Sequence, residues 1–449
     1  MLAAPSSCTR QQSVPERPAL RGELDAETLQ QALADRLVEQ GYIQTAPVEA
    51  AFRAVPRHLF VPGTPLTDAY AHRSIPTHRR RGRIVSSASA PPIVATMLEW
   101  LQLRPGMRVL EIGAGTGFNA ALMAQIVGPS GEVVTLDLDD EIVRGARAHL
   151  SVAGYERVRV LQADGAFGAP DLAPFDRVVL TAAATDVSPA WCAQLAPGGR
   201  LLLPLQLGGP LTQKLVAFDR VGDHLASDGV GECVFLTMRG AQEQRRRSQR
   251  VGHLAGVRLT VPEGVSFGDA RLDRLLAEPS QSWPTGIWAS PRDLRGGLLF
   301  WLGLHEPRLC RLTVEGAHPG GEHVPALVPY PSSVPTAITV GLVDDDGAAF
   351  LSRAVEPATA PAQEEWLTPG EVIVRGFGSC EGLARQLVEA AVGWDAAGRR
   401  SGDGLRVHAY RRGSAPMPAV HARLAADPAI SPNVLVVEKP STTLVLAWG

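Results

Sequence analysis

Three glycines at alternate positions, Gly113, Gly115 and Gly117, form the stretch of this chain whose spacing most clearly suggests chemistry. An apolar run ending in Glu111-Ile112 precedes them, and a helical pattern covers residues 119–127. Glycines allow a tight turn and let a ligand approach the backbone closely. The spacing differs from the dinucleotide pattern, and the loop has no lysine for phosphates. It therefore suits a nucleoside that carries an amino acid, with a plain strand-to-helix turn as the alternative.

Acidic residues end or follow the next apolar runs. Asp137 ends the run 132–137, at the distance from the glycines where a ribose-binding acid lies in βαβ nucleotide sites. Asp164 follows the run 158–162, and Thr181 ends the run 175–181. Ligands of parallel sheets bind outside the carboxyl ends of the strands, so the pattern predicts one site at this edge.

Serines and arginines precede the glycine loop. Ser86, Ser87 and Ser89 lie in a predicted turn before a helix at 93–101. These serines either cap that helix or orient a carboxylate that accepts a group from the bound nucleoside. The basic loop just upstream is either a solvated charge run or a receptor for an acidic peptide or a substrate carboxylate. Its members are Arg79, Arg80, Arg81 and Arg83.

The elements that must position these residues alternate between strand and helix over 108–205, which predicts a doubly wound, mostly parallel sheet. Helices are expected at 25–40 and 46–53, before the basic loop. Runs at 214–218 and 232–238 are expected to form an edge hairpin.

The length of 449 residues favours two domains. We expect a disordered lead over Met1–Glu23, a first domain over 24–241, a linker over 242–252 and an α+β domain over 253–449. In the last domain, strand-like runs cover 298–304, 434–437 and 443–448, and a long helix covers 378–392.

Composition limits the partners and the compartment. The formal net charge is −3, which argues against nucleic acid as an obligate partner. No apolar run is long enough to span a bilayer or to form a signal peptide, so no membrane partner is expected. The five cysteines include no C-x-x-C pair, and the histidines of the last domain lack metal-ligand spacing. These features predict a cytoplasmic protein without a bound metal; they give no oligomeric state.

Five ordered segments within residues 25–240 resemble the protein-L-isoaspartate O-methyltransferase family: 52–62, 89–95, 109–117, 163–165 and 174–184. The resemblance implies a class I S-adenosylmethionine-dependent methyltransferase fold, a Rossmann-like doubly wound sheet, here with an appended C-terminal α+β domain. It implies S-adenosylmethionine as cofactor and S-adenosylhomocysteine as product. The residues it places at the cofactor are Glu111, Gly113, Gly115, Thr116, Gly117, Asp137, Asp164 and Gly165.

By the same resemblance, Asp137 binds the ribose hydroxyls and Asp164 accepts from the adenine amino group. Ser89 matches the active-site serine beside the accepting carboxylate, with Ser86 or Ser87 assisting. An aspartate side chain has a pKa near 4 and is already ionised at neutral pH, so it needs no general base to attack a sulfonium methyl. The enzyme must then align the reacting atoms and exclude water.

Three departures resemble the subgroup that accompanies ribosomally made modified peptides, especially lanthipeptides. Ser87-Ala88-Ser89 replaces the usual Thr-Ile-Ser, an arginine loop precedes it, and a second domain is appended. The subgroup methylates an aspartyl carboxylate of a macrocyclic precursor, and the ester closes to a succinimide that gives isoaspartate. The alternatives are repair of L-isoaspartyl residues in damaged proteins, and a non-catalytic, cofactor-bound peptide-binding partner.

Overall fold

The computed structural model describes residues 25–243, 247–251, 256–263, 265, 274, 276, 280–315, 325–330, 336–354, 367–413 and 433–448. The expected disordered lead over residues 1–23 lies outside the described residues. Within the described ranges, no helix is long and apolar enough to cross a membrane.

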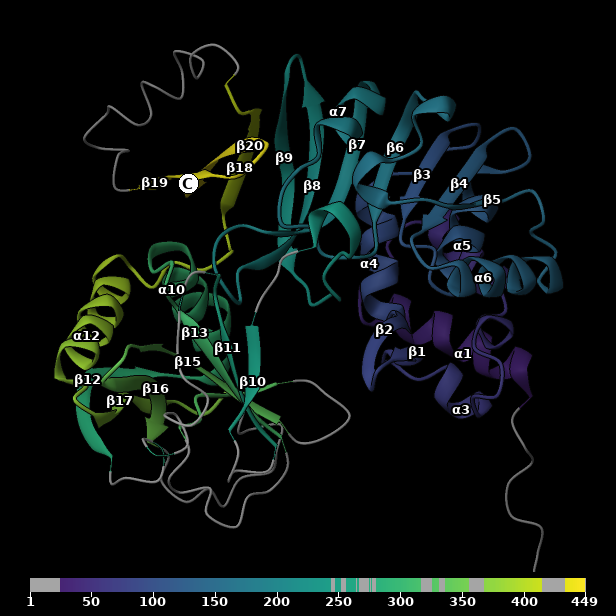
Figure 1. Cartoon of the computed structure of the whole chain (residues 1–449). Helices are drawn as coiled ribbons and strands as arrows, with labels where there is room; N and C mark the ends of the chain where they lie inside the picture. The colour runs from purple at the N-terminus through teal and green to yellow at the C-terminus, as the bar shows by residue number, and fades with distance from the viewer. Residues whose placement is uncertain are drawn as a thin grey trace, which may run out of the picture.

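A ten-stranded mixed sheet forms the larger part of the molecule (Figure 1). Its order is β19-β20-β18-β9-β8-β7-β6-β3-β4-β5, and the neighbours from β7 to β5 pair in parallel. The strands from the first half of the chain are β3 (Arg108–Ile112), β4 (Glu132–Asp137), β5 (Arg159–Gln162), β6 (Phe175–Leu180), β7 (Leu195–Gln206), β8 (Gln213–Val221) and β9 (His224–Glu232). The strands from the end of the chain are β18 (Leu405–Arg411), β19 (Val434–Glu438) and β20 (Thr442–Trp448).

Helices cover both faces of this sheet, as the alternating pattern predicts. Successive residues of a strand point to opposite faces, so Val109 belongs to one core and Leu110 to the other. The helices on this part of the chain are α1 (Ala26–Glu39), α2 (Ala46–Ala54), α3 (Leu66–Ala69), α4 (Pro91–Leu101), α5 (Phe118–Val127), α6 (Asp140–Val152) and α7 (Pro189–Gln194). Short 3₁₀ turns are η1 (Arg57–Phe60), η2 (Gly165–Phe167), η3 (Pro170–Leu172) and η4 (Gly240–Gln242).

The basic loop and the serine turn expected before α4 are instead one β-hairpin, which we call the arginine hairpin (residues 75–88). It consists of β1 (Ile75–Arg80) and β2 (Arg83–Ala88), so Ser86 and Ser87 lie in a strand. Arg81 and Gly82 join the strands, and both have positive φ, at 50° and 77°. Two-residue hairpin turns need this conformation, and Gly82 adopts it without strain.

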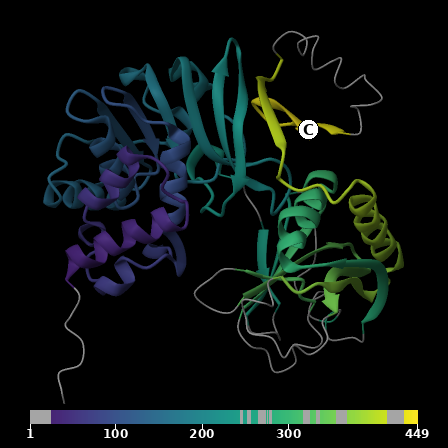
Figure 2. The same cartoon turned by 180° about the vertical axis from the view of Figure 1, so that it is seen from behind.

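A second sheet lies beside the first and is antiparallel throughout (Figure 2). Its strands are β10 (Arg247–Arg250), β11 (Val257–Val261), β12 (Gln281–Ala289), β13 (Cys310–Glu315), β14 (Val328–Tyr330), β15 (Thr336–Val343), β16 (Gly347–Ala354) and β17 (Gly370–Gly378). Its helices are α9 (Pro291–Asp293), the π-helical segment η5 (Leu294–Leu298), α10 (Leu299–His305) and α12 (Glu381–Ala396). Helices packed on an antiparallel sheet confirm the α+β class expected for this part.

Two predictions for this region are wrong. The run 298–304 is helical rather than a strand, because Ser290 and Asp293 form a capping box that starts a helix ahead of it. A short apolar run fits a buried helix as well as a strand, so periodicity alone could not decide. The expected linker 242–252 contains β10, whose polar composition suits a strand at the edge of a sheet.

The last three strands of the chain also differ from expectation. β18, β20 and β19 continue the first sheet beyond β9, so residues 405–448 do not fold with the second sheet (Figure 1). The hairpin formed by β8 and β9 is therefore internal rather than at an edge. Its second strand is His224–Glu232 and not 232–238.

Candidate active site

The glycine loop lies at the point where the sheet order reverses, between β3 and β6. The amides of Gly113 and Ala114 donate to the carbonyl of Leu136, at 2.8 and 3.0 Å. Thr181, after β6, donates from Oγ1 to the carbonyl of Gly113 at 2.6 Å. A Cβ on Gly113 would lie 2.4 Å from that hydroxyl oxygen, and φ is 106°, so only glycine fits.

The open side of the loop faces the serines of β2. Gly115 has φ of 51°, and the atoms nearest to a Cβ built on it are Ser86 Oγ at 3.9 Å and Ser87 O at 4.0 Å. Gly117 begins α5, and a Cβ there would press on Leu150 at 3.1 Å. The structure thus brings together two groups of residues that the sequence placed in separate turns.

Asp137 is tied to the same loop. Its Oδ2 accepts from the amide of Gly115 at 3.3 Å and its Oδ1 from the amide of Asp139 at 3.3 Å. Burial raises the pKa of this carboxyl group, and the backbone amides and Arg239 oppose that shift. An acidic acceptor is therefore fixed at the end of β4, beside the glycines.

Asp164 lies at the end of β5, beneath η4. Its Oδ1 accepts from the amide of Ala166 at 3.0 Å and its Oδ2 from the amide of Ala241 at 2.8 Å. A Cβ on Gly240 would lie 2.4 Å from Asp164 Oδ2, which explains a glycine at this point. Each carboxylate oxygen keeps a second lone pair for another donor. Gly165 is buried and accepts from Trp191 Nε1 at 2.8 Å.

The side chain of Glu111 lies apart from this group, whereas Thr116 belongs to the glycine loop itself. Glu111 is fully buried, and its two oxygens accept from Asn119 Nδ2 at 2.8 Å and Thr135 Oγ1 at 2.6 Å. Burial raises the pKa of Glu111 to about 7. Thr116 is buried, and its carbonyl accepts from His149 Nδ1 at 3.0 Å. The Glu111 side chain braces the loop from inside the sheet and does not face the loop's open side.

None of the three serines caps α4, whose N-cap residue is Ala90 and which has no side-chain cap. Ser86 is buried, and Thr77 donates to its Oγ at 3.1 Å. The carbonyl of Ser89 accepts from Arg57 Nη2 at 2.8 Å. With the capping alternative removed, the Ser86 hydroxyl is the one of the three that these contacts place beside the glycine loop.

Sequence reasoning missed two arginines at this site. Arg57 is buried, donates from Nε to the carbonyl of Ala69 at 2.9 Å, and lies 4.9 Å from the centre of the Phe118 ring. Burial lowers its pKa to about 10. Arg239 lies between two acids, with Nη2 at 3.8 Å from Asp137 Oδ1 and Nη1 at 3.5 Å from Asp139 Oδ2. An arginine inside an apolar, proline-bracketed segment was the available signal for Arg57; nothing local marked Arg239.

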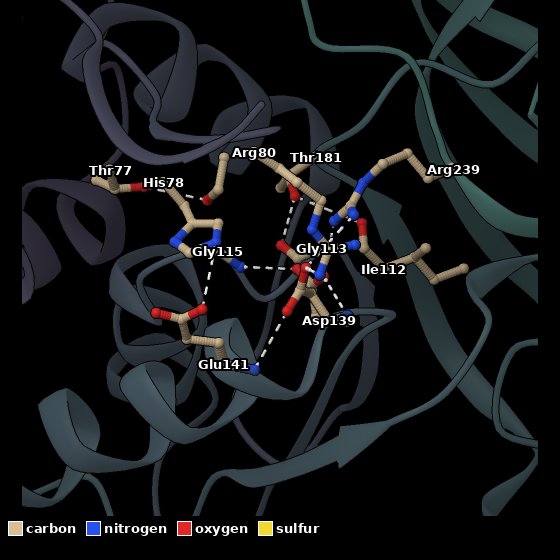
Figure 3. A network of polar contacts seen from close by, with 12 residues as sticks. Thr77, His78, Arg80, Ile112, Gly113, Gly115, Asp139, Glu141, Thr181 and Arg239 are labelled. Carbon is tan, nitrogen blue, oxygen red and sulfur yellow. Dashed lines mark hydrogen bonds and ion pairs between the residues drawn. The ribbon is translucent and has the colours of Figure 1, made fainter. Parts of the chain in front are cut away.

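The four arginines expected at the substrate do not converge. Arg80 Nη2 lies 3.0 Å from Asp139 Oδ2, at the start of α6 (Figure 3). Arg79 donates from Nη1 to the carbonyl of Gly82 at 3.4 Å, and Arg81 and Arg83 are exposed at the tip of the hairpin.

The arrangement fits a nucleoside that carries an amino acid. It offers a glycine cradle with positive φ and two fixed carboxylates at neighbouring strand ends. No group of three or more histidine, cysteine or acidic side chains that could hold a metal is present among the described residues.

Comparison with solved structures finds similar chains. One is a protein-L-isoaspartate O-methyltransferase, with a TM-score of 0.47 and 23% identity, covering 84% of this chain and 96% of that one. Another is a protein from Plasmodium falciparum described as a putative member of the same enzyme class, in complex with S-adenosyl-L-homocysteine. Its TM-score is 0.42 and its identity 19%, covering 47% of this chain and 98% of that one.

Sequence comparison is more decisive. The family model for protein-L-isoaspartate(D-aspartate) O-methyltransferase matches residues 27–243. The enzyme of this name from Hyperthermus butylicus is 39% identical over 217 residues, which cover 46% of this chain and 87% of that protein. The one from Methanopyrus kandleri is 39% identical over 212 residues, covering 47% and 91%. With such identity over most of the relatives' length, the chain belongs to the protein-L-isoaspartate O-methyltransferase family of S-adenosylmethionine-dependent carboxyl methyltransferases.

Proposed function

We propose that this enzyme methylates an aspartyl side-chain carboxylate of a ribosomally made, cross-linked peptide of the lanthipeptide type. The observation that carries the proposal is the arginine hairpin, whose strand β2 lines the glycine loop. Its tip presents Arg79, Arg81 and Arg83 to solvent, which suits an acidic peptide. A second unit of structure, with strands β10 to β17, lies outside the region that the family model matches and would receive the rest of the peptide.

The residues proposed to hold the cofactor are those gathered at the sheet edge. Gly113, Gly115 and Gly117 would lie against its methionine and ribose part, Asp137 would accept from the ribose hydroxyls, and Asp164 would accept from the adenine amino group. The positive φ of all three glycines and the space in front of Gly115, where a Cβ would meet no atom nearer than 3.9 Å, support this assignment. Glu111 would act indirectly, through Asn119 and Thr135, because its side chain is enclosed.

When bound, S-adenosylmethionine supplies an electrophilic methyl group on a sulfonium. The peptide carboxylate is ionised at neutral pH, so one of its oxygens forms the bond to the methyl carbon while the carbon–sulfur bond breaks towards sulfur. No proton moves in this step. The work left to the protein is to hold the carboxylate in line and dry, and the hydroxyls of Ser86, Ser87 and Ser89 are our candidates for orienting it.

The methyl ester then cyclises without the help of any further group of the enzyme. The backbone nitrogen of the residue after the aspartate attacks the ester carbonyl, methanol leaves, and a five-membered succinimide closes. Water opens the ring to isoaspartate or aspartate. A small residue after the aspartate favours this closure, because the nitrogen must approach the carbonyl closely.

Repair of L-isoaspartyl residues in damaged proteins is the second candidate. The relatives' names favour it, and an isoaspartyl carboxylate would need the same alignment. The two functions differ in the acceptor alone.

A comparison of matched acceptors tests the proposal. The full chain is incubated with the methyl donor in three separate reactions, each with one peptide of the same sequence: an aspartyl peptide closed by a thioether ring, its linear form, or a linear form with L-isoaspartate. Mass spectrometry follows the methyl ester and the succinimide. We expect transfer to the ring-closed aspartyl peptide above the other two. Transfer to the L-isoaspartyl peptide alone would assign the enzyme to repair.

A further inference from the structure

The acidic side chain at the start of α6 performs two separate tasks with its two oxygens. Asp139 Oδ1 accepts from the amide of Glu141 at 3.2 Å and caps the helix. Asp139 Oδ2 faces Arg80 at 3.0 Å and Arg239 at 3.5 Å. A capping residue needs only the first contact. The second oxygen therefore has a role that helix capping does not explain.

The two guanidinium groups come from segments far apart in the sequence and meet at Asp139 (Figure 3). Arg80 belongs to the arginine hairpin, and Arg239 follows the strands β8 and β9, just before η4, whose Ala241 amide donates to Asp164. The Asp139 side chain is only 5% exposed, so its charge is poorly hydrated and its ion pairs are weakly screened. With Asp137, the group contains two arginines and two carboxylates, and its formal charge is zero.

A second contact joins the same two elements. His78 Nε2 lies 3.5 Å from Oε2 of Glu141, which is the second residue of α6. Residues 78 and 80 of β1 thus both face the first turn of α6, whereas Arg79 between them donates to the carbonyl of Gly82 in its own hairpin. The contacts between hairpin and helix therefore come from residues 78 and 80, at a place where the register of the hairpin is irregular around His78.

We propose that Asp139, Arg80 and Arg239 form an ionic clasp that holds the arginine hairpin and the segment before η4 over the cofactor loop. The three are positioning residues: they keep Ser86 and Ser87 beside Gly115 and keep Arg239 next to the ribose-binding acid. Arg80 then serves the cofactor site, in contrast to the other hairpin arginines, which are left for the peptide. This inference rests on the proposed assignment of Asp137 to the cofactor, but not on which peptide is methylated.

The clasp predicts a definite pattern in cofactor affinity. A hairpin that is already in place costs less to order when the ligand binds, so loss of the clasp weakens binding. Arg80→Gln and Asp139→Asn should each raise the Kd for S-adenosylhomocysteine by about tenfold, in line with a charge-assisted contact. Asp139→Asn removes the contacts with both arginines and Arg80→Gln removes one of them, so the double variant should bind no more weakly than Asp139→Asn alone. Arg80→Lys keeps the charge and should recover most of the affinity.

Isothermal titration calorimetry of the full chain with S-adenosylhomocysteine measures these constants without any peptide. Arg79→Gln is the matched control: it removes the same charge from the neighbouring position and should change the Kd by less than about twofold. Asparagine caps helices as well as aspartate does, so Asp139→Asn keeps α6. Arg80 is 61% exposed, so its replacement does not endanger folding.

Two outcomes would overturn the clasp. Unchanged affinity in Asp139→Asn would reduce Asp139 to a helix cap. If Arg80→Gln raised only the KM for peptide, and Asp139→Asn did not, Arg80 would be a substrate-binding residue. If the ring-closed peptide failed as an acceptor, the proposed function would be lost but the test of the clasp would stand. The reason is that the affinity for S-adenosylhomocysteine is measured without any peptide.

Discussion

Arg57 donates from Nη2 to the carbonyl oxygen of Ser89 at 2.8 Å, across 32 residues of sequence. Its Nε donates to the carbonyl of Ala69, and its guanidinium lies over Phe118, the first residue of α5. One buried side chain therefore fixes the backbone at Ser89 relative to the helix that follows the glycine loop.

Replacement of Arg57 should affect both stability and turnover. A lysine cannot donate to both carbonyls at once, so Arg57→Lys leaves one buried oxygen without its partner. We expect a loss of about 1–3 kcal/mol in the free energy of unfolding, measured by urea denaturation. We also expect a lower kcat on an L-isoaspartyl peptide. Arg53→Lys is the control, because Arg53 pairs with acids at the surface, where such pairs contribute about 0–1 kcal/mol. Equal losses of unfolding free energy in Arg57→Lys and Arg53→Lys would contradict the role of Arg57 as a buried link between two carbonyl groups.

The glycine loop offers a test in which backbone strain is held constant. Gly115 has φ of 51° and Gly154, after α6, has φ of 77°, and a Cβ meets nothing closer than 3.9 Å at either position. Alanine should therefore cost about 1–2 kcal/mol of stability at both sites. Only Gly115→Ala places a methyl group between the loop and Ser86, so only this variant should lose affinity for S-adenosylhomocysteine, by tenfold or more. Calorimetry on the two variants measures the difference in their Kd for S-adenosylhomocysteine. Equal losses of affinity in Gly115→Ala and Gly154→Ala would exclude the glycine loop as the cofactor-binding site.

Glu111 should make stability depend on pH. Its pKa is raised from 4.5 to about 7 by burial, so the folded protein holds a proton that the unfolded chain releases between these values. The unfolded state gains from this ionisation, and stability therefore falls as pH rises from about 4.5 to 7, by about 3 kcal/mol, and then levels off. Glu111→Gln cannot ionise and should lack this slope. Urea titrations at pH 5 and pH 8 give the free energy of unfolding of the wild-type protein and of Glu111→Gln. The same change with pH in both proteins would show that Glu111 is ionised over this whole range.

Besides the pairing of β18 with β9, one buried carboxylate links the last strands to the first half of the chain. Asp186, which follows β6, accepts from the amide of Ser441 and from Thr442 Oγ1, both at 2.5 Å. Thr442→Val leaves a buried carboxylate oxygen without that donor and should cost about 1–3 kcal/mol. Thr443→Val, at the next position, removes a hydroxyl that bonds only the exposed Glu438 and should change stability by less than about 0.5 kcal/mol. Thermal unfolding separates the two; a similar shift for both would contradict the role of Asp186.

Much of the first sheet could be predicted because its signals are local. The run 132–137 has the bounds of β4, and Asp139, which comes directly before a helical pattern, caps α6. The same is true of Gly113 and Asp137, since a glycine turn and an acid at a strand end are properties of adjacent residues. The pattern of adjacent residues was therefore enough to predict the glycine loop and the acid at the end of β4, where we propose that the cofactor binds.

The remaining features depend on contacts between distant segments. Nothing near Arg239 indicates that Asp137 and Asp139 lie beside it, and nothing near Thr442 indicates Asp186. The polar, basic composition of 242–252 suggested a linker, whereas β10 pairs with β11. A deletion after Arg239, which the predicted domains suggest, would also remove β18, β20 and β19 from the first sheet.

The return of β18, β20 and β19 to the first sheet has a consequence for how the protein is made. A ribosome must synthesise all of β10 to α12 before these strands exist, so the nascent methyltransferase half waits with β9 uncovered. An unpaired strand edge invites wrong pairing in such an intermediate. Nonsense mutations between residue 250 and the start of β18 should therefore yield insoluble chains rather than a smaller working enzyme, even though every proposed cofactor contact is encoded upstream of them.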